Sequence, residues 1–174
     1  GRAMTIGTPI QPSFEGMDHH GRAVSDANYR GKHLLVFFGF THCKVVCPRA
    51  LARLTRVLDL LGPLAVELQA LYVTVDPERD TPRVMRTYLE ERAPRVIGLT
   101  GTRAQIDAAK RAFRVFARRA PIANDAEGYD VPHTAITYLI DPFGRYRTHF
   151  NDAVSEDKLL ESLRALLTED VSAA

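Results

Sequence analysis

The sequence predicts an α/β sandwich, in which a central β-sheet is covered by helices on both faces. First, apolar runs of strand length alternate along the chain with longer segments whose apolar residues recur every three or four positions. Second, the run at residues 34–38 is apolar at every position, as expected of a strand that is covered above and below. Third, the two cysteines of the chain, Cys43 and Cys47, follow this run closely. Because no repeat, low-complexity tract or linker interrupts the pattern, we expect residues 1–174 to form a single domain.

The chain begins with an irregular segment that we expect to contain a small hairpin. Phe14 and Val24 flank the turn sequence Asp-His-His-Gly at residues 18–21, and apolar residues on either side of such a turn are typical of a β-hairpin. This hairpin would be an N-terminal extension of the sandwich. We expect His19 and His20, which lie in the turn, to be surface residues.

Four helices are predicted from their apolar stripes and end signals. The first, at residues 48–61, carries leucines three and four positions apart and is stopped by Gly62-Pro63. The second begins at residues 80–82, where a capping side chain precedes a proline, and runs towards Arg92. The third spans about residues 102–119 and the fourth follows Ser155, with inward residues Ile106, Ala109, Phe113 and Phe116 in the third and Leu159, Leu163 and Leu166 in the fourth.

Strands occupy the apolar runs between these helices. After the run at 34–38, we expect strands at residues 66–75, 96–99, 134–140 and 145–150. The last two are separated by Asp-Pro-Phe-Gly at residues 141–144, which is a tight-turn sequence. These two strands are therefore predicted to pair as a second hairpin.

Composition narrows the classes of function. Hydrophobic residues make up 45% of the chain and charged residues 25%, a mixture typical of globular proteins rather than disordered ones. A formal net charge of +2, with no basic segment interleaved with aromatic residues, argues against nucleic acid as a partner. No apolar run approaches the roughly 18–20 residues of a membrane span. The sequence also shows no recognisable targeting signal, so the compartment cannot be read from it.

The cysteine pair indicates redox or metal chemistry. Cysteines four residues apart close almost no loop, so a disulfide between Cys43 and Cys47 would add little stability. The unpaired N–H groups and the dipole at a helix start favour thiolate over thiol, and Lys44 adds a nearby cation. One helical turn would bring both sulfurs to the same face. Because a strand leading into cysteines at a helix start is the thioredoxin-like arrangement, we predict a thioredoxin-like three-layer sandwich, with redox exchange and metal binding both open.

Four segments of the chain resemble the Sco/SenC family. They are residues 38–48 around the cysteines, residues 74–82, residues 98–101, and a C-terminal region with His133-Thr134 and residues 138–141. The segments occur in the order found in that family, and the resemblance extends over roughly residues 7–167. It is therefore much more specific than one short motif.

The resemblance implies a copper-binding metallochaperone. At the matching positions the implied copper ligands are Cys43, Cys47 and His133. Soft thiolates select Cu(I) and imidazole also binds copper well; Cu(II) stays open as a second carried state, and a Cys₂His set could also hold zinc. The implied function is delivery of copper for assembly of the copper centre of cytochrome c oxidase. The implied partner is the copper-bearing oxidase subunit, or else another copper chaperone.

The resemblance also implies a location. Members of the family are anchored in a membrane and face the bacterial periplasm or the mitochondrial intermembrane space. The resemblance therefore implies membrane contact only through an N-terminal anchor that this sequence lacks. We therefore expect this chain on the periplasmic side of the bacterial inner membrane, or in the intermembrane space if the source is eukaryotic. We also expect the protein to be a monomer.

The sequence departs from the family pattern beside the implied ligands. Lys44 and Val45 stand where the family has proline and aspartate, and Pro132 stands where an aspartate precedes His133. A lysine can partly neutralise the negative charge of Cu(I) with two thiolates, so copper is still expected. The loss of the acidic residues leaves partner recognition and the Cu(II) state open.

Pro132 supports an alternative function. Val131-Pro132 before a strand resembles the segment of thioredoxin-type oxidoreductases in which a cis proline faces the cysteines. We therefore predict a cis peptide bond between these two residues. The chain would then be a thiol–disulfide oxidoreductase with Cys43 and Cys47 as its redox pair, reducing cysteines of an oxidase subunit or another extracytoplasmic protein. Whether the chain is an enzyme stays open on the sequence alone.

Polar residues near the cysteines allow two interpretations each. His42 adjoins Cys43 and could tune its pKa or act as a labile ligand, or it could be a partly exposed residue at the edge of the site. Asp76, Arg79 and Asp80 lie in a loop after a strand, where functional residues often gather. They could shape the site or dock a partner, or they could simply hold a capped turn.

Overall fold

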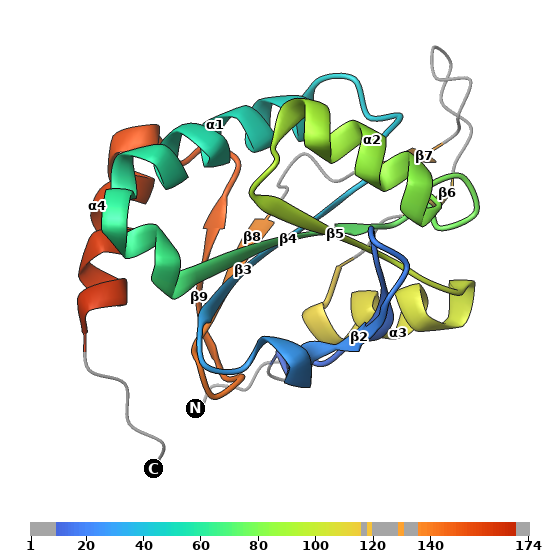
Figure 1. Ribbon diagram of the computed structural model, residues 1–174, viewed down its shortest axis with the longest axis horizontal. Helices are drawn as coiled ribbons and strands as arrows, with labels where there is room; N and C mark the ends of the chain where they lie inside the picture. The colour runs from blue at the N-terminus through green and yellow to red at the C-terminus, as the bar shows by residue number, and fades with distance from the viewer. Residues whose placement is uncertain (1–9, 116–117, 120–128, 131–135, 170–174) are drawn as a thin grey trace, which may run out of the picture.

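The computed structural model describes residues 10–115, 118–119, 129–130 and 136–169. A seven-stranded sheet with strand order β2-β1-β5-β4-β3-β8-β9 runs through it (Figure 1). Its strands are β1 Glu15–Asp18, β2 Ala23–Ser25, β3 His33–Gly39, β4 Leu68–Thr74, β5 Val96–Thr100, β8 Ile136–Ile140 and β9 Tyr146–Asn151. A short antiparallel pair is formed by β6 Arg118–Arg119 and β7 Tyr129–Asp130.

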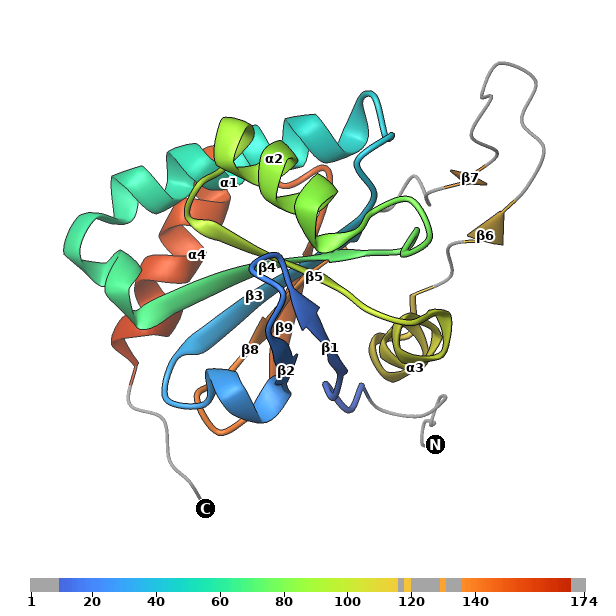
Figure 2. The ribbon, with the colours of Figure 1, turned by 45° about the vertical axis from the view of Figure 1, so that its right-hand side comes forward.

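Helices cover both faces of the sheet, as the predicted thioredoxin-like sandwich requires. They are α1 Val46–Leu61, α2 Pro82–Arg92, α3 Arg103–Phe113 and α4 Glu156–Thr168. The first, second and fourth pack on one face and α3 packs on the other (Figure 2). None of the helices in the described part of the chain is both long and apolar enough to cross a membrane.

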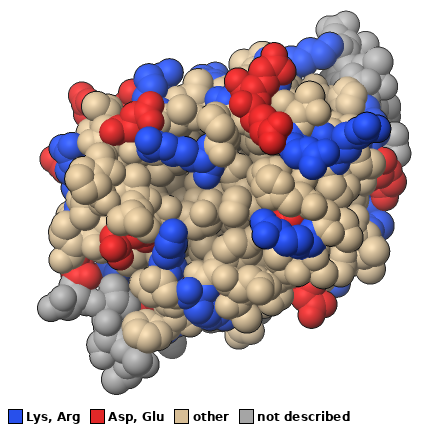
Figure 3. Space-filling model, in the orientation of Figure 1, with Lys and Arg blue, Asp and Glu red and all other residues tan. Residues whose placement is uncertain are grey.

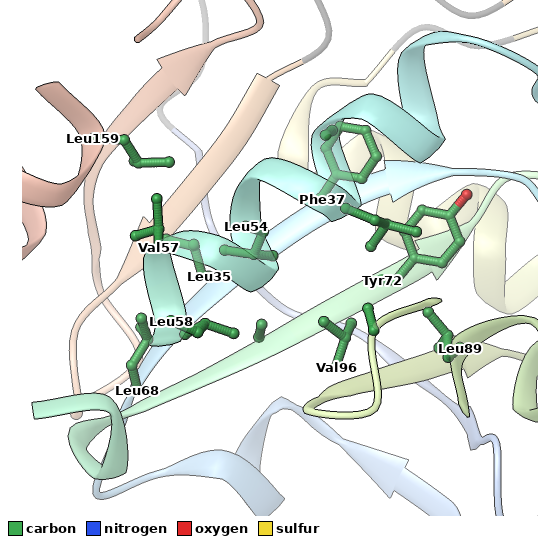
Figure 4. Packing of buried hydrophobic residues seen from close by; sticks show 14 of the residues in the cluster. Leu35, Phe37, Leu54, Val57, Leu58, Leu68, Tyr72, Leu89, Val96 and Leu159 are labelled. Carbon is green, nitrogen blue, oxygen red and sulfur yellow. The ribbon is translucent and has the colours of Figure 1, made fainter. Parts of the chain in front are cut away.

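The central strand β3 explains why the core has two layers. All seven of its residues are buried, and successive side chains of a strand point to opposite faces of the sheet. Leu35 and Phe37 contribute to the cluster under α1, α2 and α4 (Figure 4), whereas Leu34, Val36 and Phe38 contribute to the cluster under α3. The strand lies between a parallel neighbour, β4, and an antiparallel one, β8. It therefore ends at a fixed position, immediately before the cysteines.

Most element boundaries agree with the sequence pattern because capping residues set them. The side chains of Thr81, Thr102 and Ser155 each accept a hydrogen bond from a backbone N–H in the first turn of the helix that follows. Helix α1 begins two residues earlier than predicted, so Cys47 lies in its first turn. The segment after it, Gly62–Glu67, forms a 3-10 helix, so β4 begins two residues later than predicted.

One detail of the predicted helices was wrong and one was incomplete. Helix α3 ends at Phe113 rather than near residue 119, because Arg114 adopts a left-handed conformation (φ 61°) and closes the helix. In α4, Leu166 packs against the core as predicted but is only partly buried, and Leu167 is a further buried residue of this face. The apolar spacing alone did not distinguish these alternatives, because a stripe can be continued past the true end of a helix.

The N-terminal hairpin forms as predicted but one of its histidines is not a surface residue. Strands β1 and β2 pair antiparallel, and β1 also pairs with β5 at the edge of the sheet. This second pairing covers His19, which is 6% exposed and accepts a hydrogen bond at Nδ1 from the N–H of Gly98 (2.8 Å). His20 is exposed, as expected.

The charges of the surface are mixed. Figure 3 shows basic and acidic side chains interspersed around a broad uncharged area on the face that it draws. Many are in ion pairs across element boundaries, such as Arg56 with Glu156 and Arg95 with Asp59. Exposed pairs of this kind contribute little to stability, so the fold depends mainly on its two buried clusters.

Candidate metal and redox site

The two cysteines come together at the junction of β3 and α1. Cys43 lies in the loop between these elements and is partly buried, and Cys47 lies in the first turn of α1 with no exposed surface. Both thiols are free. The backbone N–H of Cys47 donates a hydrogen bond to Cys43 Sγ over 3.3 Å. The spacing of four residues therefore does what the sequence suggested and puts both sulfurs at one helix start.

The pKa values of the two cysteine thiols are shifted in opposite directions. The pKa of Cys43 is lowered to about 6, chiefly by a hydrogen bond from the Cys47 thiol and then, against the effect of burial, by the N–H groups of Cys47, Val45 and Val46. The pKa of Cys47 is raised, because its proton is shared with Cys43 and because the side chain is buried. At neutral pH the pair therefore holds one proton, with a thiolate at Cys43 and a thiol at Cys47.

A glycine at the end of β3 makes room for Cys47. A methyl group on Gly39 would lie 2.7 Å from Cys47 Sγ and 2.8 Å from the hydroxyl oxygen of Tyr72. Such distances are too short for any carbon atom, so a larger residue would displace the sulfur or the tyrosine. Gly39, Cys47 and Tyr72 thus meet at one buried point, which the sequence analysis did not identify.

The loop before Cys43 is held by a buried carboxylate. Asp80 has no exposed surface and accepts hydrogen bonds from the N–H of Thr41 (3.0 Å), the hydroxyl of Thr41 (2.6 Å) and the hydroxyl of Thr74 (2.7 Å). These bonds join the loop after β3 to the loop after β4. Of the two interpretations that the sequence left open for Asp80, the structure therefore supports the one in which it shapes the site.

Asp76 and His42 lie beside this carboxylate. Asp76 is buried and its carboxylate pairs with Arg79. His42 is exposed, and one of its ring nitrogens lies within 4.8 Å of carboxylate oxygens of both Asp76 and Asp80. His42 is thus a residue at the edge of the cysteine site, in contact range of acidic groups.

An open groove of about 410 Å³ runs beside the site. It lies between the Thr41–His42 segment and α2, and its walls include Val84, Tyr88 and Arg92. The guanidinium of Arg92 sits 4.2 Å from the centre of the Tyr88 ring. Val45, next to the cysteines, is 64% exposed. The surroundings of Cys43 therefore offer both apolar and cationic surface to an approaching molecule.

Several residues that the sequence singled out lie outside the described residues. They include His133, the implied third ligand, with its neighbour Thr134; Val131 and Pro132, for which a cis peptide bond was predicted; and Phe116, predicted to point inward. Residues that the sequence analysis missed are Gly39 and Tyr72. Their contact depends on the parallel register of β3 and β4, which sets Phe37 beside Tyr72 and which the sequence pattern does not contain.

Comparison with known proteins gives consistent matches over most of the chain. The SCO1/SenC family model matches residues 2–168. The mitochondrial protein SCO1 homolog of Homo sapiens is 37% identical over 165 residues, which is 93% of this chain; the chain spans 54% of that relative's length. An SCO2-like protein of Rickettsia prowazekii is 36% identical over 148 residues, covering 85% of this chain and 72% of the relative.

Solved structures match equally well. The structure of Bradyrhizobium japonicum ScoI with copper bound has a TM-score of 0.80 and 37% identity, covering 90% of this chain and 99% of that one. Yeast Sco1 with copper bound has a TM-score of 0.83 and 28% identity, covering 95% of this chain and 92% of that one. The thioredoxin-like fold and the sequence resemblance therefore point to the same group of proteins.

Proposed function

The chain belongs to the SCO1/SenC family, and from that premise we propose that it is a metallochaperone that delivers copper for assembly of the cytochrome c oxidase copper centre. The proposed ligands are Cys43, Cys47 and His133, and the carried ion is Cu(I), with Cu(II) as a second state. Similar proteins whose structures are described with copper bound support the choice of metal.

The observation that carries the proposal is the paired sulfurs at the start of α1. Soft thiolates are the protein ligands that Cu(I) prefers, and the pair already holds a thiolate at Cys43. Binding of Cu(I) between the sulfurs would release the proton of Cys47, so affinity should rise with pH. The N–H of Cys47 and the positive end of the helix dipole stabilise the resulting negative charge.

Release of the metal follows from the small number of ligands. Two thiolates and one imidazole make a three-coordinate site, which leaves room for a ligand from a partner to join before one of the chain's own leaves. Cys43 is the accessible sulfur, since Cys47 is fully buried. We propose that the partner, the copper-bearing oxidase subunit or another copper chaperone, approaches over Val45 and the groove beside His42.

The proposal also includes the oligomeric state and the cellular location of the protein. We propose that residues 1–174 act as one monomeric domain of a membrane-anchored protein. The setting would be the periplasmic side of the bacterial inner membrane, or the mitochondrial intermembrane space if the source is eukaryotic. The mitochondrial relatives support a setting in that organelle or in its bacterial counterpart.

Thiol–disulfide exchange is the second candidate, and the asymmetry of the pair favours it. An accessible thiolate with a pKa of about 6 is suited to attack a disulfide, and a buried neighbouring thiol is suited to resolve the mixed disulfide that results. This activity uses the same two cysteines. Substitution of either cysteine would therefore not separate the two functions.

His133 separates them, because only the metal carrier needs its imidazole. The test is an anaerobic Cu(I) titration of the fully reduced protein against a competing chelator, for wild type, His133→Ala and His149→Ala. We expect one tightly held copper per chain and, for His133→Ala, a loss larger than the ~10–100-fold typical of an outer partner of a metal ligand. His149→Ala removes an exposed imidazole on β9 and should bind copper as wild type does. Weak copper binding, or binding indifferent to His133, would favour the oxidoreductase.

A further inference from the structure

Tyr72 carries a buried hydroxyl group that packing does not explain. The residue lies in β4 and has no exposed surface. Its ring stacks between Phe37 and Tyr88, with centroid distances of 5.8 and 6.0 Å. Figure 4 shows the ring beside Phe37, with its oxygen pointing away from the leucine-rich end of the cluster. A phenylalanine would fill the same space, so the ring accounts for the packing and the hydroxyl does not.

Among the described residues, none forms a hydrogen bond of normal geometry with this hydroxyl. A buried hydroxyl without a partner destabilises the folded state, because the group has lost its bonds to water. Buried polar side chains are satisfied in the large majority of cases, so an exception suggests a partner in another state of the protein.

The atom that can become this partner is the Cys47 sulfur. Cys47 Sγ and the Tyr72 hydroxyl oxygen converge on Gly39, since one methyl group at that position would lie within 2.8 Å of both. A thiol sulfur is a weak acceptor, whereas a thiolate is a charged acceptor and forms a bond roughly twice as strong. The surroundings are apolar and closed, which strengthens such a bond further.

We propose that Tyr72 is a positioning residue of the cysteine site, whose buried hydroxyl donates a hydrogen bond to Cys47 Sγ when the cysteine pair binds Cu(I) or exchanges a disulfide. The inference deepens the proposed function, since Cys47 becomes an anion when it binds Cu(I). It also applies when Cys47 attacks a disulfide. In the metal-free structure the hydroxyl makes no hydrogen bond of normal geometry. We therefore expect the bond to the sulfur to strengthen when the cysteine pair binds metal or exchanges a disulfide.

The test compares Tyr72→Phe with Tyr138→Phe. Tyr138 is also a buried tyrosine, but it lies in the cluster on the other face of the sheet, away from Cys47. We expect Tyr72→Phe to bind Cu(I) about tenfold more weakly than wild type, or 1.4 kcal/mol. The Tm of the metal-free protein should stay the same or rise, because an unsatisfied group is removed. Tyr138→Phe should bind copper as wild type does.

A second measurement needs no metal. The Cys43 thiolate attacks one sulfur of oxidised glutathione. A mixed disulfide forms, and one glutathione leaves as thiolate. Cys47 then loses its proton to solvent and attacks the Cys43 sulfur, so that the Cys43–Cys47 disulfide forms and the second glutathione leaves as thiolate. The lifetime of the mixed disulfide can be followed by acid quenching and mass spectrometry. A tenfold change in the acidity of the Cys47 thiol is offset by about half through the nucleophilicity of its thiolate, so we expect the lifetime to lengthen about threefold in Tyr72→Phe.

The outcomes separate this inference from the proposed function. If wild type holds copper and Tyr72→Phe holds it equally tightly, the role of Tyr72 is overturned. If wild type does not hold copper, the proposed function fails and the mixed-disulfide lifetime alone decides, with an unchanged lifetime overturning the inference. A weaker copper affinity that comes with a lowered Tm of the metal-free protein would show a structural role only, and would also overturn it.

Discussion

Replacement of Asp80 by alanine would test whether a buried carboxylate holds the loop that leads to the first cysteine. The substitution removes the acceptor for three hydrogen bonds, two from Thr41 and one from Thr74. The hydroxyl of Thr74, which is itself buried, would lose this partner. We therefore expect both a loss of stability and a disturbance of the Cys43 loop.

The size of the effect follows from these three bonds. A hydrogen bond to a charged group contributes about 1.5–3 kcal/mol, but three bonds that share one carboxylate are not additive. Some repulsion between Asp80 and the buried carboxylate of Asp76, which lies within 4.8 Å, would also be relieved. We expect Asp80→Ala to lower the free energy of unfolding by about 3–5 kcal/mol. Asp80→Asn retains one acceptor oxygen and should lie between alanine and wild type.

Urea unfolding followed by circular dichroism measures this change directly. The control is Asp59→Ala, since Asp59 is an exposed carboxylate on α1 that pairs with Arg95 at 3.3 Å. Its loss should lower the free energy of unfolding by less than about 1 kcal/mol. The alkylation rate of Cys43 in native protein reports on the loop and should change in Asp80→Ala alone. An Asp80→Ala protein within about 1 kcal/mol of wild type would refute the reasoning, because the three bonds would then contribute no net stability.

Three further predictions concern the site and the hairpin. Alkylation of Cys43 by iodoacetamide should rise with pH around a midpoint near 6 and then level off, because its pKa is lowered to about 6; a midpoint near the ordinary value of about 8.5 would contradict this. Gly39→Ala should lower the free energy of unfolding by about 1–3 kcal/mol and weaken copper binding, since the added methyl group overlaps Cys47 Sγ; urea unfolding and copper competition at wild-type values would rule out the close contact. Burial lowers the pKa of His19 below 6.5, so the unfolded chain binds a proton more readily and stability should fall as the pH drops below that value. His19→Asn should lose part of this dependence and His20→Asn should keep it, as measured by urea unfolding at several pH values; equal pH profiles for the two variants would exclude a role for the buried ring.

Much of the fold could be predicted because the signals for it are local. The cap at Thr81 followed by proline and the cap at Ser155 both set helix starts as predicted. The uninterrupted apolar run of β3 identified the central strand, and the turn after Phe14 identified the hairpin. Each of these features depends on residues a few positions apart, so the sequence contains them directly.

The errors and omissions come from contacts between distant segments. His19 is buried because β1 pairs with β5, some 80 residues later, and no residue near the turn signals this. The end of α3 depends on the conformation of Arg114, although the apolar spacing continues past it. The contact of Tyr72 with Cys47 requires the register of β3 against β4.

The cysteine site was predicted in part. A helix start after a buried strand indicated that a cysteine thiol there would have a lowered pKa, and the pKa of Cys43 is lowered. The opposite shift at Cys47 depends on its complete burial, which spacing alone does not reveal. His133 rests on the family resemblance, because a single histidine before an apolar strand carries no metal signal of its own.

X-ray absorption spectroscopy of the Cu(I)-loaded protein, with Cys47→Ser as comparison, tests the central claim most directly. The technique counts the sulfur and nitrogen atoms bound to the metal. We expect two sulfur atoms and one nitrogen atom in wild type, and one sulfur fewer in Cys47→Ser. A copper ion with fewer than two sulfur neighbours in wild type, or a spectrum unchanged by Cys47→Ser, would contradict it.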